Sequence, residues 1–201
     1  MRSQPARPQR EFLVEVYGPL FAALGRLSLP SPVRLSDFIN EREGFLRLTE
    51  AEFLASGPIP SGTNRHAEYL INKSGIELIC QPDELAFQHH PDDEHGKMLW
   101  QAFSQMAGSS NPDLRVHKQP YPVQVHTHRF IVNAELHLAE GAAPEAMLSN
   151  LPTKFVPVTN ATARFINARN EVLVIERKLM LVNRDHILLV EVDRRRHARA
   201  A

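Results

Sequence analysis

Histidine is the residue type most open to chemistry in this sequence, and its densest cluster is a candidate metal site. The cluster mixes imidazoles with carboxylates and reads His89-His90-Pro91-Asp92-Asp93-Glu94-His95. Such a mixture suits zinc or a harder divalent ion. Its spacing matches neither a His-Glu-x-x-His helix nor a Cys/His finger, and Pro91 favours an extended loop over a rigid ligand set. His89, His90 and His95 are therefore metal candidates without a recognised motif.

The second candidate is the pair His126 and His128. Alternate residues of a strand lie on the same face, so this pair has the better-defined geometry. Two imidazoles still need a third ligand, and the neighbouring sequence does not identify one. Because most surface histidines are only solvated, we expect no resident metal ion or other cofactor at either cluster.

Nucleophilic catalysis has no support in the sequence, which contains neither a Gly-x-Ser-x-Gly elbow nor a Gly-rich phosphate loop. The single cysteine, Cys80, ends an apolar run, and we interpret it as a buried strand residue. The acidic segment that follows it lacks the positive charge that activates a thiol. The turn trio Arg184, Asp185 and His186 is a further candidate site, but Asp and His also tolerate turn geometry, and we favour that explanation.

The elements that position these residues are predicted by an internal repeat. Four blocks recur in the same order and at nearly constant spacing, which indicates two diverged copies of one unit. The blocks are 21–29 with 130–138, 35–40 with 145–150, 45–51 with 155–161, and 69–79 with 180–190.

Each copy is predicted to fold as strand, short helix, strand, strand, turn and strand. Apolar residues at alternate positions of 130–138 are typical of a half-buried strand. Short helices are expected at 36–39 and 145–148, and tight hairpin turns at 72–75 and 183–185. So few strands usually close into a barrel or pack against a twin, because open edges invite aggregation.

The second copy resembles an uncharacterised family of small bacterial β-domains. The resemblance lies in Lys154-Phe-Val-Pro-Val-Thr-Asn-Ala-Thr162 and Leu181-Val-Asn-Arg-Asp-His-Ile187. It covers residues 129–192 well and residues 12–80 loosely. The family carries no activity that the resemblance could imply. The turn and closing strand are also distantly similar to Sm-like and SH3-like barrels.

A helix is predicted between the two copies, over residues 97–106. Its apolar face includes Leu99, Phe103 and Met106 at helical spacing, and Trp100 lies beside that face. These four residues are candidate interaction residues. The helix either covers a groove between the two copies or binds a partner, as amphipathic helices commonly do.

Composition places the chain among ordinary globular proteins. Lys plus Arg and Asp plus Glu are balanced at 23 each, so no global field attracts nucleic acid or a membrane surface. Basic residues gather at both ends, which makes nucleic-acid binding an alternative that we do not favour. A lone cysteine fits a reducing compartment, and no apolar run spans a membrane. We expect a cytoplasmic protein.

These observations predict a mainly β (α+β) protein made of two tandem small repeats, barrel-like or sandwich-like, that pack as a pseudo-dimer. The expected organisation is a basic arm at 1–11, a repeat at 12–80, an acidic and helical connector at 81–127, a repeat at 128–192 and a basic tail at 193–201.

For the function we favour a non-enzymatic scaffold or assembly subunit that contacts a protein partner or itself. One alternative is a binding module for a peptide, a small ligand or nucleic acid. The other alternative is a metal-dependent enzyme that uses the His-rich segments.

Overall fold

The structure is a computed structural model of the 201-residue chain. It describes residues 9–41, 44–54, 68–82, 118–139, 141–142, 153–166 and 172–192. Within these residues the chain is mainly β, with ten strands and a single α-helix, which confirms the predicted fold class at that level.

The first half contains five of these described strands. Their bounds are β1 (Gln9–Tyr17), β2 (Ala22–Pro30), β3 (Phe45–Leu54), β4 (Tyr69–Asn72) and β5 (Leu78–Cys80). The helix α1 (Leu35–Glu41) joins β2 to β3, and buries Leu35 and Ile39. A 3-10 turn, η1 (Lys73–Gly75), joins β4 to β5. The short helix predicted at 36–39 is therefore confirmed.

The second half contains the other five described strands and a second 3-10 turn. Their bounds are β6 (Lys118–His126), β7 (Phe130–Ala139), β8 (Phe155–Ile166), β9 (Val172–Asn183), η4 (Arg184–His186) and β10 (Leu189–Val192). The strand β6 occupies the end of the range expected to be a connector, and β1 begins within the expected N-terminal arm. The helix predicted at 145–148 lies outside the described residues.

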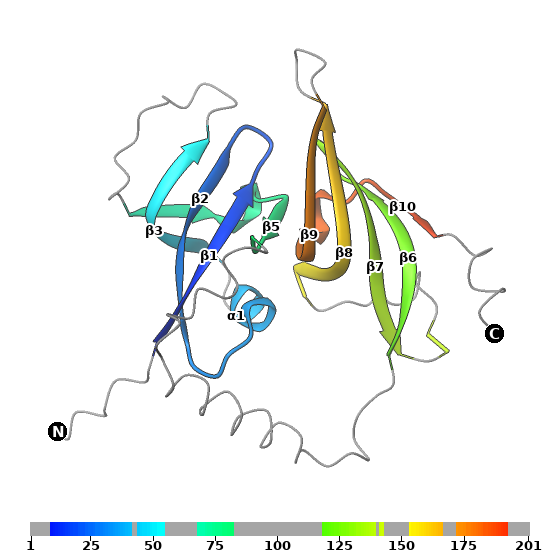
Figure 1. Cartoon of the computed structure of the whole chain (residues 1–201), viewed down its shortest axis with the longest axis horizontal. Coiled ribbons are helices and arrows are strands. Elements are labelled where there is room, and N and C mark those ends of the chain that lie inside the picture. The colour runs from blue at the N-terminus through cyan, green and yellow to red at the C-terminus, as the bar shows by residue number, and fades with distance from the viewer. Residues whose placement is uncertain are drawn as a thin grey trace, which may run out of the picture.

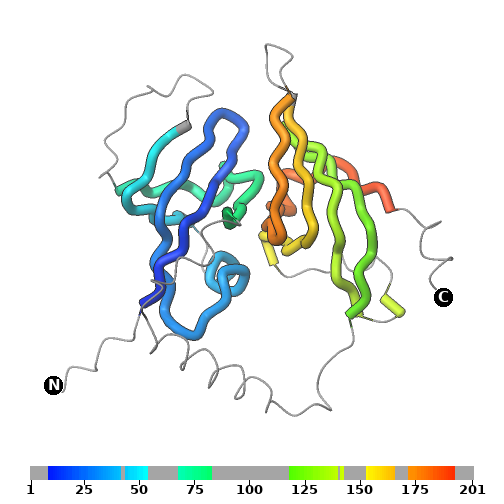
Figure 2. The backbone as a smooth tube through the Cα atoms, viewed as in Figure 1, coloured from blue at the N-terminus to red at the C-terminus, as the bar shows by residue number. Residues whose placement is uncertain are grey.

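All ten strands form one antiparallel sheet, in the order β10-β6-β7-β8-β9-β5-β1-β2-β3-β4. The sheet is open rather than closed, with β10 and β4 as its two end strands. In Figure 1, β10 and β3, the neighbour of β4, lie at opposite sides of the molecule. Each half contributes a continuous run of five strands, which Figure 2 separates as blue to green and green to red.

The two halves meet where β5 pairs with β9, with Leu78 opposite Val182 and Cys80 opposite Met180. Two hydrophobic cores lie on either side of this pairing, and each takes residues from both halves. Phe155 and Leu181 pack into the core of the first half. Tyr17, Leu78 and Cys80 pack into the core of the second half. The halves are therefore interlocked at the β5–β9 pairing.

None of the helices among the described residues is long and apolar enough to cross a membrane.

Candidate functional site

The junction between the two halves concentrates the polar contacts between segments that are far apart in sequence. Arg177 on β9 makes a two-pronged ion pair with Glu15 on β1, at 2.6 Å between Nη2 and Oε1 and 3.0 Å between Nε and Oε2. Asn40 at the end of α1 exchanges two hydrogen bonds with the backbone of Phe155. Such charge-assisted and paired contacts fix how one half sits on the other.

The turn η4 is held against the turn η1 by a buried amide. The side chain of Asn183 donates hydrogen bonds to the carbonyls of Lys73 and Ile76, at 3.2 Å and 2.7 Å. Its oxygen accepts from the backbone N–H of Asp185, which caps η4. Since Asn183 is fully buried, both turns are fixed where β5 meets β9.

The two described histidines of the predicted pair do not share a strand face. The strand β6 ends at His126, and His128 lies in the turn that leads to β7. His126 lies 3.0 Å from the side-chain oxygen of Gln124 and 3.5 Å from the carboxylate of Glu191. His128 instead approaches His186, with ring centroids 5.5 Å apart. The prediction that His126 and His128 share a strand face is wrong, because β6 ends at His126 and does not continue to His128.

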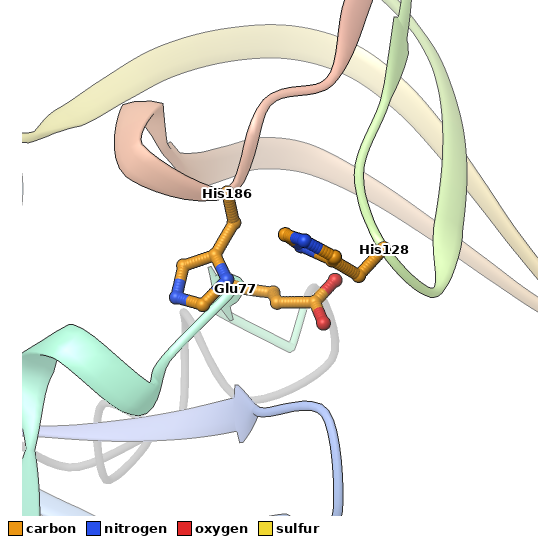
Figure 3. A group of neighbouring side chains, drawn as sticks. All are labelled: Glu77, His128 and His186. Atoms are coloured by element: carbon orange, nitrogen blue, oxygen red, sulfur yellow. The ribbon is translucent and has the colours of Figure 1, made fainter.

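Among the described residues, three potential metal ligands converge at the junction. Glu77, His128 and His186 each offer one ligand atom, and these atoms lie within 4.8 Å of one another (Figure 3). They come from three segments: the residue before β5, the β6–β7 turn and the 3-10 turn η4. Two imidazoles and a carboxylate are a ligand set that zinc accepts.

Neither Glu77 nor His186 was predicted as a ligand from the sequence, although His186 was considered as part of a turn trio. The two residues meet only because β5 pairs with β9, and local spacing does not reveal that pairing. One signal was available, because the predicted repeat aligns Gly75 with His186 and Leu188 with Glu77. A polar residue that departs from its copy is a candidate for a role that the copy lacks.

Of the remaining candidates, only Cys80 lies within the described residues. Cys80 is fully buried in β5, as interpreted from the sequence, and burial raises the pKa of its thiol, which disfavours the nucleophilic thiolate. The other metal and interaction candidates lie outside the described residues. These are His89, His90, His95, Leu99, Trp100, Phe103 and Met106.

Compared with protein-family models, with curated proteins and with solved structures, the chain has no match. The resemblance to a family of small bacterial β-domains therefore stays a prediction.

Proposed function

We propose that this chain is an assembly subunit made of two copies of one five-stranded unit. Copies of the chain associate head to tail, with β10 of one pairing with β4 of the next. This pairing between molecules repeats the pairing of β5 with β9 inside the molecule.

The duplication is supported by the strand order. The first half runs β5-β1-β2-β3-β4 across the sheet, and the second half runs β10-β6-β7-β8-β9. In both runs the last strand along the chain, β5 or β10, lies beside the first, β1 or β6. The fourth strand, β4 or β9, lies at the far side of the run. We call two residues counterparts when they occupy equivalent positions in the two runs, as Phe45 opposite Asn72 and Phe155 opposite Asn183 do.

The two halves also share their irregularities. The register between β2 and β3 shifts at one point, and the register between β7 and β8 shifts at the counterpart point. Each shift is accompanied by a non-glycine residue with positive φ, Glu50 at 49° and Asn160 at 48°. Bulges are specific features of a strand pair rather than defects, so their coincidence favours a common origin.

The observation that carries the assembly is a contrast in burial on the fourth-strand side. Phe155 and Leu181 are fully buried because they enter the core of the first half at the junction. Their counterparts on the β3–β4 side, Phe45 and Leu70, are 61% and 63% exposed. Large apolar residues at an open sheet edge are a liability that proteins normally cover. A second copy of this chain offers the cover that the junction already provides internally.

The other end of the sheet shows the same contrast. Leu78 on β5 is fully buried against β9, whereas its counterpart Leu189 on β10 is 50% exposed. The neighbouring Leu188 is 63% exposed. The two ends are thus different surfaces, and in the proposed assembly one covers the other. Head-to-tail contacts of this kind are heterologous and build rings or open filaments.

The test is the oligomeric state of the full chain, measured by light scattering over a range of concentrations. We expect a mass above the 22.8 kDa of one chain, and we expect Leu70→Lys to reduce it to one chain, since a charge on an edge strand opposes pairing. Ile131→Lys is the matched control, because Ile131 is 40% exposed but lies on β7 between β6 and β8. A monomeric wild type, or a Leu70→Lys variant that assembles like the wild type, would overturn the proposal.

The register of the contact can be tested by crosslinking. Inside the chain Ile79 pairs with Leu181, and their counterparts are Val190 and Leu70. Cysteines introduced at Leu70 and Val190 are expected to form a disulfide between chains on oxidation. Cys80 does not interfere, because it is buried. Ladders of covalent oligomers support the head-to-tail contact, and monomer alone after oxidation contradicts it.

A cytoplasmic location belongs to the same proposal. It is supported by the lone cysteine, which leaves the chain without an internal disulfide framework.

A further inference from the structure

The buried carboxylate of Glu77 is only half satisfied. Its Oε2 accepts hydrogen bonds from the Thr127 hydroxyl at 2.6 Å and from the Arg129 backbone N–H at 3.3 Å. Its Oε1 is buried and has no hydrogen-bond partner. The residue is 0% exposed, and a buried carboxylate oxygen without a partner is costly.

The ring of His186 has a matching deficit. Its Nε2 lies 2.7 Å from the carbonyl oxygen of Ser74. Because a carbonyl oxygen only accepts, Nε2 carries the hydrogen, and Nδ1 of the neutral ring presents a lone pair. That Nδ1 is also buried without a hydrogen-bond partner. Two unsatisfied electron-pair donors therefore face the same space, which a cation would satisfy at once.

His128 completes the set from the β6–β7 turn. Its side chain is exposed, so its ring can reorient at little cost. The ligand atoms of the three residues already lie within 4.8 Å of one another. Zinc bonds of about 2.0–2.2 Å to nitrogen and oxygen require only a modest approach of these atoms. In Figure 3 the Glu77 carboxylate reaches toward the His128 ring, with the His186 ring beside it.

The guanidinium of Arg129 is a cation close enough to interact with the charge of Glu77. Its Nη1 donates to the carbonyls of Gly18 and Pro19, at 2.9 Å and 2.6 Å. It also lies 4.1 Å from the centre of the Phe165 ring. Burial lowers the pKa of Arg129, and the charge of Glu77 acts in the opposite direction. The Arg129 guanidinium is thus held by carbonyl groups of the β1–β2 turn. It does not donate to Oε1 of Glu77, which stays without a hydrogen-bond partner.

We propose that Glu77, His128 and His186 bind one divalent transition-metal ion, with zinc as the best fit. Imidazole ligands favour zinc, copper and nickel over magnesium and calcium, which prefer oxygen. Three protein ligands leave a fourth position for water in a tetrahedral zinc site. The ion joins the first half to the second, because Glu77 belongs to one and both histidines belong to the other.

The site is separate from the proposed assembly contact. The counterparts of Glu77, His128 and His186 are Leu188, Pro19 and Gly75, and none of these has a metal-ligating side chain. The internal junction is therefore the one place in the repeated arrangement of described residues where this ligand set forms. A metal at the junction is not required by the head-to-tail contact.

The test is a zinc titration of the full chain, purified without a His tag and stripped of metal, against a competing chelator dye. We expect one tight equivalent of zinc, a rise in melting temperature on adding it, and no comparable response to magnesium. His186→Ala and His128→Ala should each weaken the tight equivalent by at least about tenfold, since even the loss of an outer-shell partner costs about that much.

Glu77→Gln separates metal binding from folding. Glutamine keeps an oxygen for Thr127 and offers an N–H to Nδ1 of His186, so the metal-free variant should melt no lower than the metal-free wild type while losing the tight zinc. His126→Ala is a matched control that should keep it. Replacing His89, His90 and His95 together should also keep it. A wild type without a tight equivalent, or tight binding that survives His186→Ala, would overturn the proposal.

Discussion

At the scale of single residues, the junction contains polar side chains that are much less exposed to solvent than similar pairs on the surface. The pair formed by Glu15 and Arg177 is largely withdrawn from solvent, with side-chain exposures of 14% and 23%. Its hydrogen bonds raise the pKa of Arg177, whereas burial acts to lower it. By contrast, Arg47 and Glu68 form an ion pair of similar length with exposures of 66% and 48%.

These two ion pairs give a matched prediction. Arg177→Met should lower the free energy of unfolding by about 1–3 kcal/mol, because it leaves a poorly solvated carboxylate without its charged partner. Arg47→Met should leave stability nearly unchanged, since exposed pairs contribute little. Chemical denaturation of both variants beside the wild type measures the difference. Equal effects would show that the junction pair contributes no more than a surface pair.

Residue-scale chemistry was the part least accessible from the sequence. His128 was identified as a potential ligand, but it was paired with His126 because alternation seemed to continue through the turn. Glu77 stood inside an apolar run and carried no motif. Its meeting with His186 follows from strand pairing across the two halves, which is a property of the tertiary structure and not of local spacing.

At the scale of elements, prediction succeeded where the apolar pattern was regular. The alternation in β7 and the short helix α1 were both expected. The range of β6 was assigned to the connector, with only His126 and His128 placed on a strand. Pro120 and Pro122 lie in this range, and proline is disfavoured in a strand interior. The structure accommodates them because, among the described residues, β10 pairs only with Val123–His126. Both prolines therefore lie where β6 pairs with β7 alone.

A second element-scale feature is the close approach of β2 to β3 at Gly25. A Cβ at this position would lie 2.8 Å from the Cβ of Ala51, which is closer than non-bonded carbons approach. We expect Gly25→Ala to destabilise the protein by about 1–3 kcal/mol through overpacking. Gly75→Ala is the control, because no atom lies within 4 Å of the added Cβ. If Gly25→Ala and the control have the same melting temperature, β3 can shift to accommodate the added methyl group without loss of stability.

At the scale of the whole molecule, the proposed duplication implies one interface that occurs twice, closed inside the chain and open at the two end strands of the sheet. Inside the chain the junction buries Phe155, Leu181 and Leu78, and the proposed metal adds a link that the outer edges lack. The internal junction is therefore expected to be permanent, whereas the proposed contact between chains depends on concentration. This division follows from the three positions at which the proposed copies differ in their ligating residues, Glu77, His128 and His186.

The two proposals predict opposite effects of chelation and of Leu70→Lys on the assembled mass and on the bound zinc. Chelation should lower the melting temperature without changing the assembled mass, because the counterpart positions Pro19, Gly75 and Leu188 hold no ligand. Zinc at about 100 times its Kd would stabilise the fold by about 2.7 kcal/mol, which sets the scale of the shift. Leu70→Lys should do the reverse, giving single chains that keep one zinc each. Light scattering and metal analysis on the same samples distinguish the outcomes. Chelation that dissolves the assembly would mean that the metal lies between chains rather than within one.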